Sequence, residues 1–282
     1  MKPPAGPPGG ATEGVKLRKL GIIGGTSWNS TALYYDHVNR EIARRLGGLS
    51  SARLTIESID LAPYAALQNS GELDQAERII VDAGLSLKAA GVEAILIASN
   101  TSNRFASAVE TATGIPLLGI AGPTIARLKK DGRRRVALLG TRYVVTEDFL
   151  SEQYEEAGIE VVPCAADWVM TVDKIIFDEL AKGIVRRDSQ RALKTLLTEL
   201  SRQKVDAVVL ACTELVMAVD PRANVLPVYD TTEIHARAAV DWMLDPPGGA
   251  RASLRRRQSA AYLPIGEQGR SPRPSACPRA LQ

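Results

Sequence analysis

The sequence predicts an α/β fold of two pseudosymmetric halves, each a mostly parallel sheet flanked by helices. Three observations lead to this prediction. Short apolar runs alternate with amphipathic helical patterns, the order of these runs occurs twice, and one segment of the first half closely matches one of the second. Apolar runs separated by helical patterns are typical of βα units and parallel sheets.

The first half is expected to begin with a buried strand and to alternate from there. LRKLGIIGG at 17–25 is an apolar run, and RLTIESID at 53–60 alternates between apolar and polar residues. Ile80, Ala83 and Leu87 lie near one face of a helical pattern. The expected elements are strands at 17–25, 53–60, 92–98 and 115–120 and helices at 30–46 and 74–90.

The second half repeats this order. VEAILIASNT at 92–101 matches VDAVVLACTE at 205–214 in register, and IIGGT at 22–26 pairs with LLGT at 138–141. A repeat of about 115 residues is too long for a solenoid and indicates two duplicated halves. The expected strands of the second half are at 135–140, 159–164, 205–211 and 224–228.

The matched segments place Ser99 and Cys212 at equivalent positions, each directly after a strand. Ligands of open parallel sheets bind beyond the carboxyl ends of the strands. If these ends face each other across a pseudo-twofold axis, the two side chains flank one cleft from opposite sides, which is the geometry that inversion of a stereocentre needs. The alternative is that both strands merely end in small residues.

Composition and charge separate the two tails from the folded part of the chain. Residues 246–282 contain seven arginines and one acidic residue, whereas the whole chain has a net charge of +3, so the part between the ends is acidic. A nucleic-acid groove would need the basic charge on the folded part, although the arginines at 255–257 could contact RNA or an acidic membrane. We expect disordered tails at 1–16 and 246–282, a first half at 17–123 plus about 224–245, and a second half at 124–223.

The remaining composition predicts a cytoplasmic protein without a membrane segment. No apolar run approaches the ~20 residues of a membrane helix, and the N-terminus lacks the apolar centre of a signal peptide. Cys164, Cys212 and Cys277 have neither disulfide nor metal-ligand spacing. We expect Cys164 in the core and Cys277 in the tail.

Seven motifs, in order along residues 19–243, resemble the aspartate/glutamate racemase family, and within it the bacterial broad-specificity and L-aspartate/glutamate-type members. The resemblance implies a cofactor-independent amino-acid racemase, without pyridoxal phosphate (PLP) or metal, that usually forms a homodimer. The motifs are LGIIGGTSWNST at 20–31, RRLGGLSSA at 44–52, SNTSN at 99–103, VALLGTRYV at 136–144, IIFDEL at 175–180, ACTEL at 211–215 and LPVYDTTEIHA at 226–236.

The family uses one cysteine per half to move a proton at Cα. Cys212 retains this position, and a helix that begins after its strand is expected to favour the thiolate through backbone N–H groups and the helix dipole. Ser99 stands where the other cysteine is usual, and Asn103 stands where a histidine is common. A hydroxyl is a poor acid and base near neutral pH, so Ser99 is expected to be the weak partner.

Six further residues are expected to bind the substrate. Residues that follow the two catalytic positions offer N–H and hydroxyl groups for the α-carboxylate and for the charge that develops on it. Gln68 matches a substrate-contacting position of the closer relatives, and His235 is expected to lie at a helix end or in the core. The predicted binding residues are Thr26, Gln68, Asn100, Thr101, Thr213 and Glu214.

The substrate itself is left open by the sequence. Relatives usually place a cation before the IIFDEL helix to hold a side-chain carboxylate, whereas here the stretch reads DWVMTVDK, with Lys174 as the nearby cation. Two alternatives to a racemase therefore remain. One is a decarboxylase or isomerase of a dicarboxylate that uses Cys212 alone, and the other is a non-catalytic amino-acid-binding protein.

Overall fold

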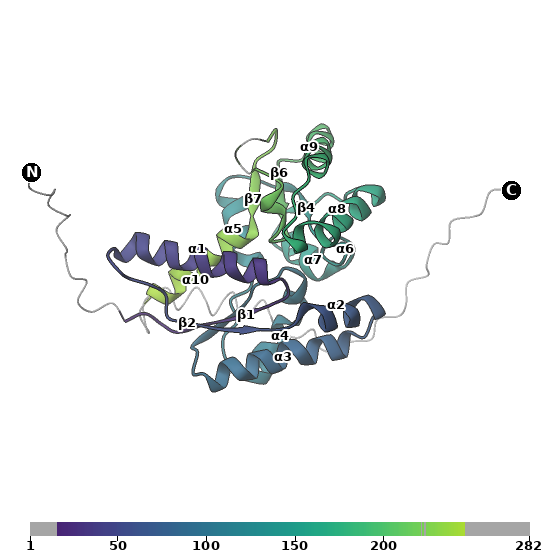
Figure 1. Cartoon of the computed structure of the whole chain (residues 1–282). Helices are drawn as coiled ribbons and strands as arrows, with labels where there is room; N and C mark the ends of the chain where they lie inside the picture. Colours follow the sequence, from purple (N-terminus) through teal and green to yellow (C-terminus); the bar gives the residue numbers. More distant parts are fainter. Residues whose placement is uncertain (1–15, 221, 223, 246–282) are drawn as a thin grey trace, which may run out of the picture. The chain divides into compact units, whose positions relative to one another are not determined.

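A computed structural model of the chain describes residues 16–220, 222 and 224–245 (Figure 1). The tails predicted at 1–16 and 246–282 therefore lie outside the described residues, apart from Lys16. The described part contains two parallel sheets flanked by helices, which confirms the predicted α/β class.

The first sheet has three parallel strands. β1 (Leu20–Gly24) lies between β2 (Leu54–Ser58) and β3 (Ala94–Ile97). The fourth strand predicted at 115–120 is reduced to a single bridge between Ile95 and Leu117. Pro116 explains this difference, because proline has no N–H to donate and interrupts a ladder.

The second sheet has four parallel strands in the order β5-β4-β6-β7. β5 is shorter than the predicted 159–164 strand, which Pro163 interrupts in the same way. β7 pairs with β6, so it belongs to this sheet, and the chain returns to the first sheet only after it. The strands are β4 (Arg135–Leu139), β5 (Glu160–Val161), β6 (Ala207–Leu210) and β7 (Val228–Asp230).

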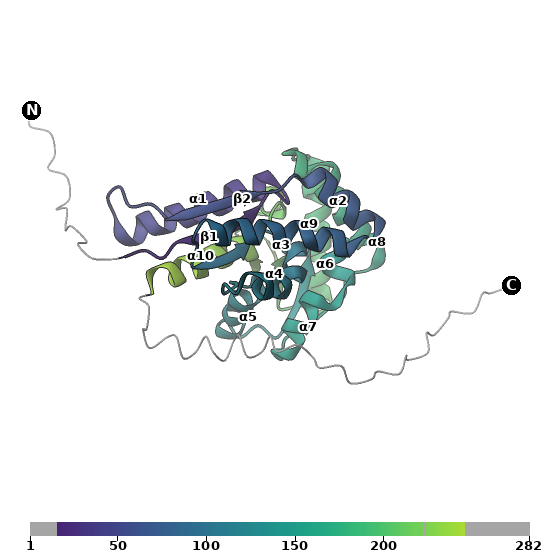
Figure 2. The same ribbon diagram turned by 90° about the horizontal axis from the view of Figure 1, so that it is seen from below.

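Helices cover both faces of each sheet, and we call each sheet with its helices the first or the second half (Figures 1 and 2). None of the helices in the described part is long and apolar enough to cross a membrane. The first half contains α1 (Trp28–Leu46), α2 (Leu61–Ser70), α3 (Leu73–Ala89), the 3-10 helix η1 (Thr101–Phe105), α4 (Ala106–Thr113) and α10 (Thr231–Leu244). The second half contains α5 (Ala121–Lys130), α6 (Arg142–Thr146), α7 (Asp148–Glu156), α8 (Ala166–Asp178), η2 (Leu180–Lys182), α9 (Arg187–Arg202) and η3 (Leu215–Met217).

Alternate residues of one strand pack against different helix layers. In β1, Ile22 packs with the core side chains of α1 and α10, whereas Ile23 packs with those of α3 and α4. In β6, Val208 packs toward α8 and α9, and Val209 toward α5 and α7. Because both faces are buried, the strands read as continuous apolar runs in the sequence.

The turn after β1 requires glycine. Gly25 has a φ of +85°, and a Cβ on it would lie 2.0 Å from the Ile59 carbonyl oxygen. The Ser27 hydroxyl then caps α1 by accepting from the Ser30 N–H. The glycine and the cap together bring the first turn of α1 to the carboxyl edge of the first sheet.

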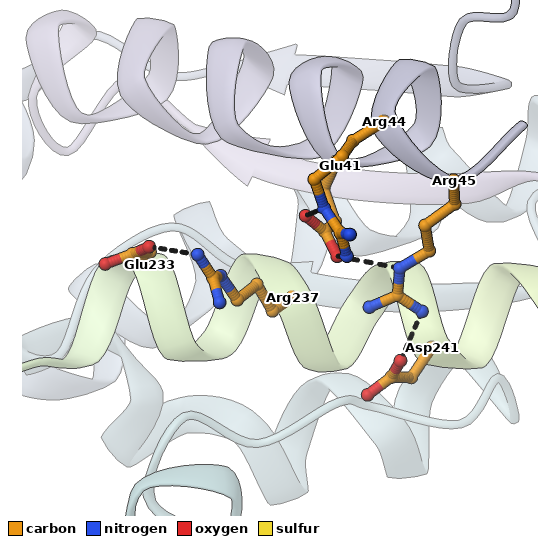
Figure 3. Close-up of polar contacts among 6 residues, drawn as sticks. All are labelled: Glu41, Arg44, Arg45, Glu233, Arg237 and Asp241. Atoms are coloured by element: carbon orange, nitrogen blue, oxygen red, sulfur yellow. Dashed lines mark hydrogen bonds and ion pairs between the residues drawn. The ribbon is translucent and has the colours of Figure 1, made fainter. Parts of the chain in front are cut away.

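An ion network joins α1 to α10 (Figure 3). Glu41 is buried and accepts from Arg44 and from Arg45, and Arg45 also contacts Asp241 on α10. Hydrogen bonds from these arginines lower the pKa of Glu41 from 4.5 to about 2, against the opposing effect of burial. Glu41 therefore favours the folded state while it is ionised.

We predict that Glu41 stabilises the fold in a pH-dependent way. A lowered pKa in the folded state gives stability that is present above pH 4.5 and is lost as the pH falls towards 2. Glu41→Gln should lower the free energy of unfolding by about 1–3 kcal/mol at pH 7, and this difference should shrink at pH 3.5 in urea titrations. Asp36→Asn is the control, because the Asp36–Arg40 pair is exposed on the same helix and should change the free energy of unfolding little at either pH. An equal loss at both pH values for Glu41→Gln would contradict the prediction.

Candidate active site

One pocket of the described part is lined by residues from both halves. The first half contributes the turns after β1 and β3 and part of α2, and the second half contributes the turns after β4 and β6 and the end of α8. The structure places all eight residues that the sequence singled out at this pocket. They are Thr26, Gln68, Ser99, Asn100, Thr101, Cys212, Thr213 and Glu214.

Cys212 lies beside a carboxylate. Its Sγ donates to Oε2 of Glu214 at 3.1 Å, and the Thr213 hydroxyl donates to the same oxygen at 2.7 Å. Burial, the charge of Glu214 and this hydrogen bond raise the pKa of the Cys212 thiol well above its ordinary value. The resting group is therefore a protonated thiol with a proton acceptor in contact.

The expected helix dipole is not available to Cys212. The element that follows is η3, a three-residue 3-10 helix that starts at Leu215, too short for a macrodipole of the size that longer helices develop. The backbone N–H groups of Glu214 and Leu215 do lower the thiol pKa, but burial and the Glu214 carboxylate dominate. The expectation of a helix-stabilised thiolate was wrong for this reason.

Ser99 lies at the equivalent turn after β3. Its Oγ accepts from the Ser102 N–H at 3.2 Å. The Asn103 amide donates to the carbonyl oxygens of Ser99 (2.6 Å) and Ile97 (3.2 Å), and its Oδ1 accepts from the Ile120 N–H. Asn103 therefore holds the shape of this turn.

Two pocket-lining amides have a polar atom without a protein partner. The Thr231 hydroxyl donates to the Leu210 carbonyl at 2.8 Å, so it can only accept from Asn100, at 3.0 Å. This orients the Asn100 amide and leaves its buried Oδ1 without a protein partner. The buried Nε2 of Gln68 has no protein partner either. Buried polar atoms are normally paired, so one free acceptor and one free donor suit a ligand that has both an ammonium and a carboxylate group.

Ser30, Tyr64 and Tyr143 are among the pocket residues that the sequence did not single out. Ser30, in the first turn of α1, donates to Oε1 of Glu214 at 2.7 Å and also contacts the Thr213 hydroxyl. Tyr64 contacts the Ser102 hydroxyl, and burial raises the pKa of Tyr64 to about 12. Tyr143 follows β4 in the VALLGTRYV motif, which was quoted only for its resemblance. The signal for Ser30 was its place directly after the glycine turn of β1.

The pocket lining includes no lysine or arginine among the residues that the structure describes. Lys174 and Met170 are exposed on α8, and neither lines the pocket. Arg142, which lies next to the lining residues of the β4 turn, is paired with Asp173 at 2.9 Å and donates to Asn69. Glu214 is the charged residue of the lining.

Other candidate groups belong to the core. His235 is buried, its ring contacts the Tyr34 hydroxyl and the Leu118 carbonyl, and burial lowers its pKa to about 4. Cys164 packs partly buried against the core of the second half, and its pKa is raised to about 11 by burial. Cys277 lies outside the described residues. No cluster of histidine, cysteine and acidic side chains in the described ranges could hold a metal ion.

Comparison with known proteins identifies the family. The family model described as Asp/Glu/Hydantoin racemase matches residues 23–239. The broad-specificity amino-acid racemase RacX of Bacillus subtilis (strain 168) is 24% identical over 229 residues, which cover 80% of this chain and 98% of RacX.

Solved structures agree with this match. A candidate Asp/Glu racemase from Yersinia pestis is 37% identical, with a TM-score of 0.75, and the match covers 81% of this chain and 100% of that one. An aspartate racemase homologue from Pyrococcus horikoshii OT3 is 30% identical, with a TM-score of 0.69, over 80% of this chain and 99% of that one. The chain therefore belongs to the Asp/Glu/hydantoin racemase family and is an isomerase of the amino-acid racemase type.

Proposed function

We propose that the chain inverts the Cα stereocentre of a free amino acid by proton transfer between Cys212 on one face and Ser99 on the other. The observation that carries this proposal is that the turns after β3 and β6, from different halves, line one pocket with these two side chains. Two proton-transfer groups from opposite halves suit a reaction that removes a proton from one face and returns one to the other.

The substrate backbone has matching partners in the same pocket. The free Oδ1 of Asn100 can accept from the ammonium group, and the free Nε2 of Gln68 can donate to a carboxylate oxygen. Thr26 and Thr101 add hydroxyl groups to the lining, whereas the Thr213 hydroxyl, which also lines the pocket, already donates to Glu214. Donors held around the α-carboxylate stabilise the charge that develops on it when the Cα proton leaves.

We also propose that the reaction uses no cofactor. PLP chemistry needs a lysine that forms a Schiff base, and no lysine is among the described residues that line the pocket. As the family resemblance implies, we propose a homodimer that works in the cytoplasm. Trp28 and Tyr35, two turns apart on α1 and both exposed, are apolar surface suited to a contact between copies.

The serine at position 99 favours a second candidate function. With one thiol and one hydroxyl, the pocket could instead protonate an intermediate from one side only, as a decarboxylase of a dicarboxylate does. Incubation in D₂O separates the possibilities: a racemase exchanges the Cα proton, a decarboxylase releases CO₂, and a binding protein does neither.

The proposed mechanism requires the Cys212 thiol. Cys212→Ala should abolish turnover, because no other thiol lines the described pocket, while the melting temperature stays close to that of the wild type. Cys164→Ala is the matched control and should retain activity, since Cys164 packs against the second-half core. Racemisation within tenfold of wild type in Cys212→Ala, followed by polarimetry, would overturn the assignment.

Ser99 should make the two directions differ in isotope exchange. Enantiomers have equal free energies, so kcat/KM must be equal in both directions, and the asymmetry can appear only in kcat, KM or washed-in deuterium. The enantiomer whose Cα–H faces Cys212 should exchange faster than it inverts. Ser99→Cys should raise turnover, by up to the ~10²–10⁴-fold that a matched acid/base group contributes. Unchanged turnover together with equal exchange of both enantiomers would exclude Ser99 as a proton-transfer group.

The charge of the lining indicates a neutral substrate side chain. A side-chain carboxylate in a closed pocket without a cation costs several kcal/mol, and Glu214 would repel it. Leu61, Ile176 and Phe177 instead offer apolar surface. We therefore propose that the enzyme acts on at least one neutral amino acid.

A panel of amino acids tests this substrate proposal. Turnover of some neutral amino acid should at least match that of aspartate and glutamate. Lys174→Ala should leave the ratio between neutral and acidic substrates unchanged, because Lys174 is exposed and does not line the pocket. Turnover confined to aspartate and glutamate would refute the proposal, and a selective loss of acidic substrates in Lys174→Ala would show that Lys174 reaches the substrate.

A further inference from the structure

Glu214 is held by side chains from both halves. Its Oε1 accepts from Ser30 on α1 of the first half, and its Oε2 accepts from Thr213 and from the Cys212 thiol. Ser30, Thr213 and Glu214 are all buried. Both carboxylate oxygens therefore already accept hydrogen bonds, and Oε2 contacts the Cys212 sulfur.

We infer that Ser30 is a positioning residue that holds Glu214 against Cys212, so that Glu214 takes the thiol proton when the two halves are together. This inference rests on the proposed function of Cys212. In the step, the S–H bond of Cys212 breaks, the proton moves to Oε2 of Glu214, and the electron pair stays on sulfur. The thiolate then accepts the Cα proton, and the reverse transfers restore the resting pair.

The hydrogen-bond pattern explains why a positioning residue is needed. The donors on Glu214 keep the negative charge on oxygen, and a carboxylate held in contact with sulfur opposes a free thiolate. The proton therefore leaves Cys212 only by transfer to the carboxylate, which requires the two atoms to stay in contact. Ser30 comes from the opposite half, so this contact depends on how the halves meet.

The titratable groups near Glu214 are few. Cys212 contacts it directly, and Tyr64 from α2 and Tyr143 from α6 line the same pocket. None of the ion pairs in the described part involves Glu214. A change in pH dependence caused by a Ser30 variant can therefore be traced to the Cys212–Glu214 pair.

The experiment measures the thiol directly, without substrate. The rate of Cys212 alkylation by iodoacetamide is followed against pH by mass spectrometry of the peptide that contains Cys212. In Ser30→Ala, Glu214 is free to turn away from sulfur, so the midpoint should move to lower pH, by about one unit for a lost charged hydrogen bond. Ser30→Thr keeps the hydroxyl and should restore the wild-type midpoint.

A double-mutant cycle shows whether Ser30 acts through Glu214. Glu214→Gln should lower the midpoint by itself, and adding Ser30→Ala to it should cause no further shift. Ser189→Ala is the control, because Ser189 is also a buried serine that donates to a glutamate, Glu179, at 2.6 Å, and neither residue lines the pocket. It should leave the midpoint unchanged.

The kinetic readout should agree. Ser30→Ala should lower kcat by about 10–100-fold, within the range of acid/base effects, with KM nearly unchanged. An unshifted alkylation midpoint in Ser30→Ala, or an equal shift in the Glu214→Gln background, would overturn the inference. A shifted midpoint in a protein that turns over no amino acid would instead support the inference and refute the proposed function.

Discussion

Parallel strand pairing is the constraint on which the pocket depends. In the first half β3 pairs with β1, and in the second half β6 pairs with β4, each in register up to the last residues of the strands. The turn after the first strand of each half therefore meets the turn after the third. Gly140 shows how closely they meet, since a Cβ on it would lie 2.7 Å from the Ala211 carbonyl oxygen.

Hydrogen bonds between side chains then join the two halves around the pocket. Thr101 contacts Thr141 at 2.9 Å, and the Asn69 amide oxygen accepts from Arg142 and from Tyr143. These contacts are polar, and an apolar contact accompanies them, because Ile234 of α10 packs against the core of the second half. The two halves are therefore joined both at the pocket and through α10.

The sequence predicted the positions of the strands more accurately than their lengths. The apolar runs and the 92–101 and 205–214 match placed β1, β3, β4 and β6 within a few residues, because fully buried parallel strands leave a strong apolar signal. The strands predicted at 115–120 and 159–164 are longer than the observed ones. An apolar run in the sequence predicts a strand even where a proline within it lacks the N–H that the ladder needs. The sequence placed the return to the first half at about 224, whereas β7 still pairs with β6 in the second sheet and only α10 packs on the first half.

By itself, the sequence predicted the two-half α/β architecture, the family and eight of the residues that line the pocket. All of these eight except Gln68 lie in short motifs that follow strands. Tertiary structure decided the chemistry of Cys212. Glu214 is its neighbour in the chain, yet only the fold directs the carboxylate at sulfur and brings Ser30 from 184 positions away to hold it there. The pKa of a buried thiol depends on burial and on the charges within a few ångströms, and spacing along the chain specifies neither.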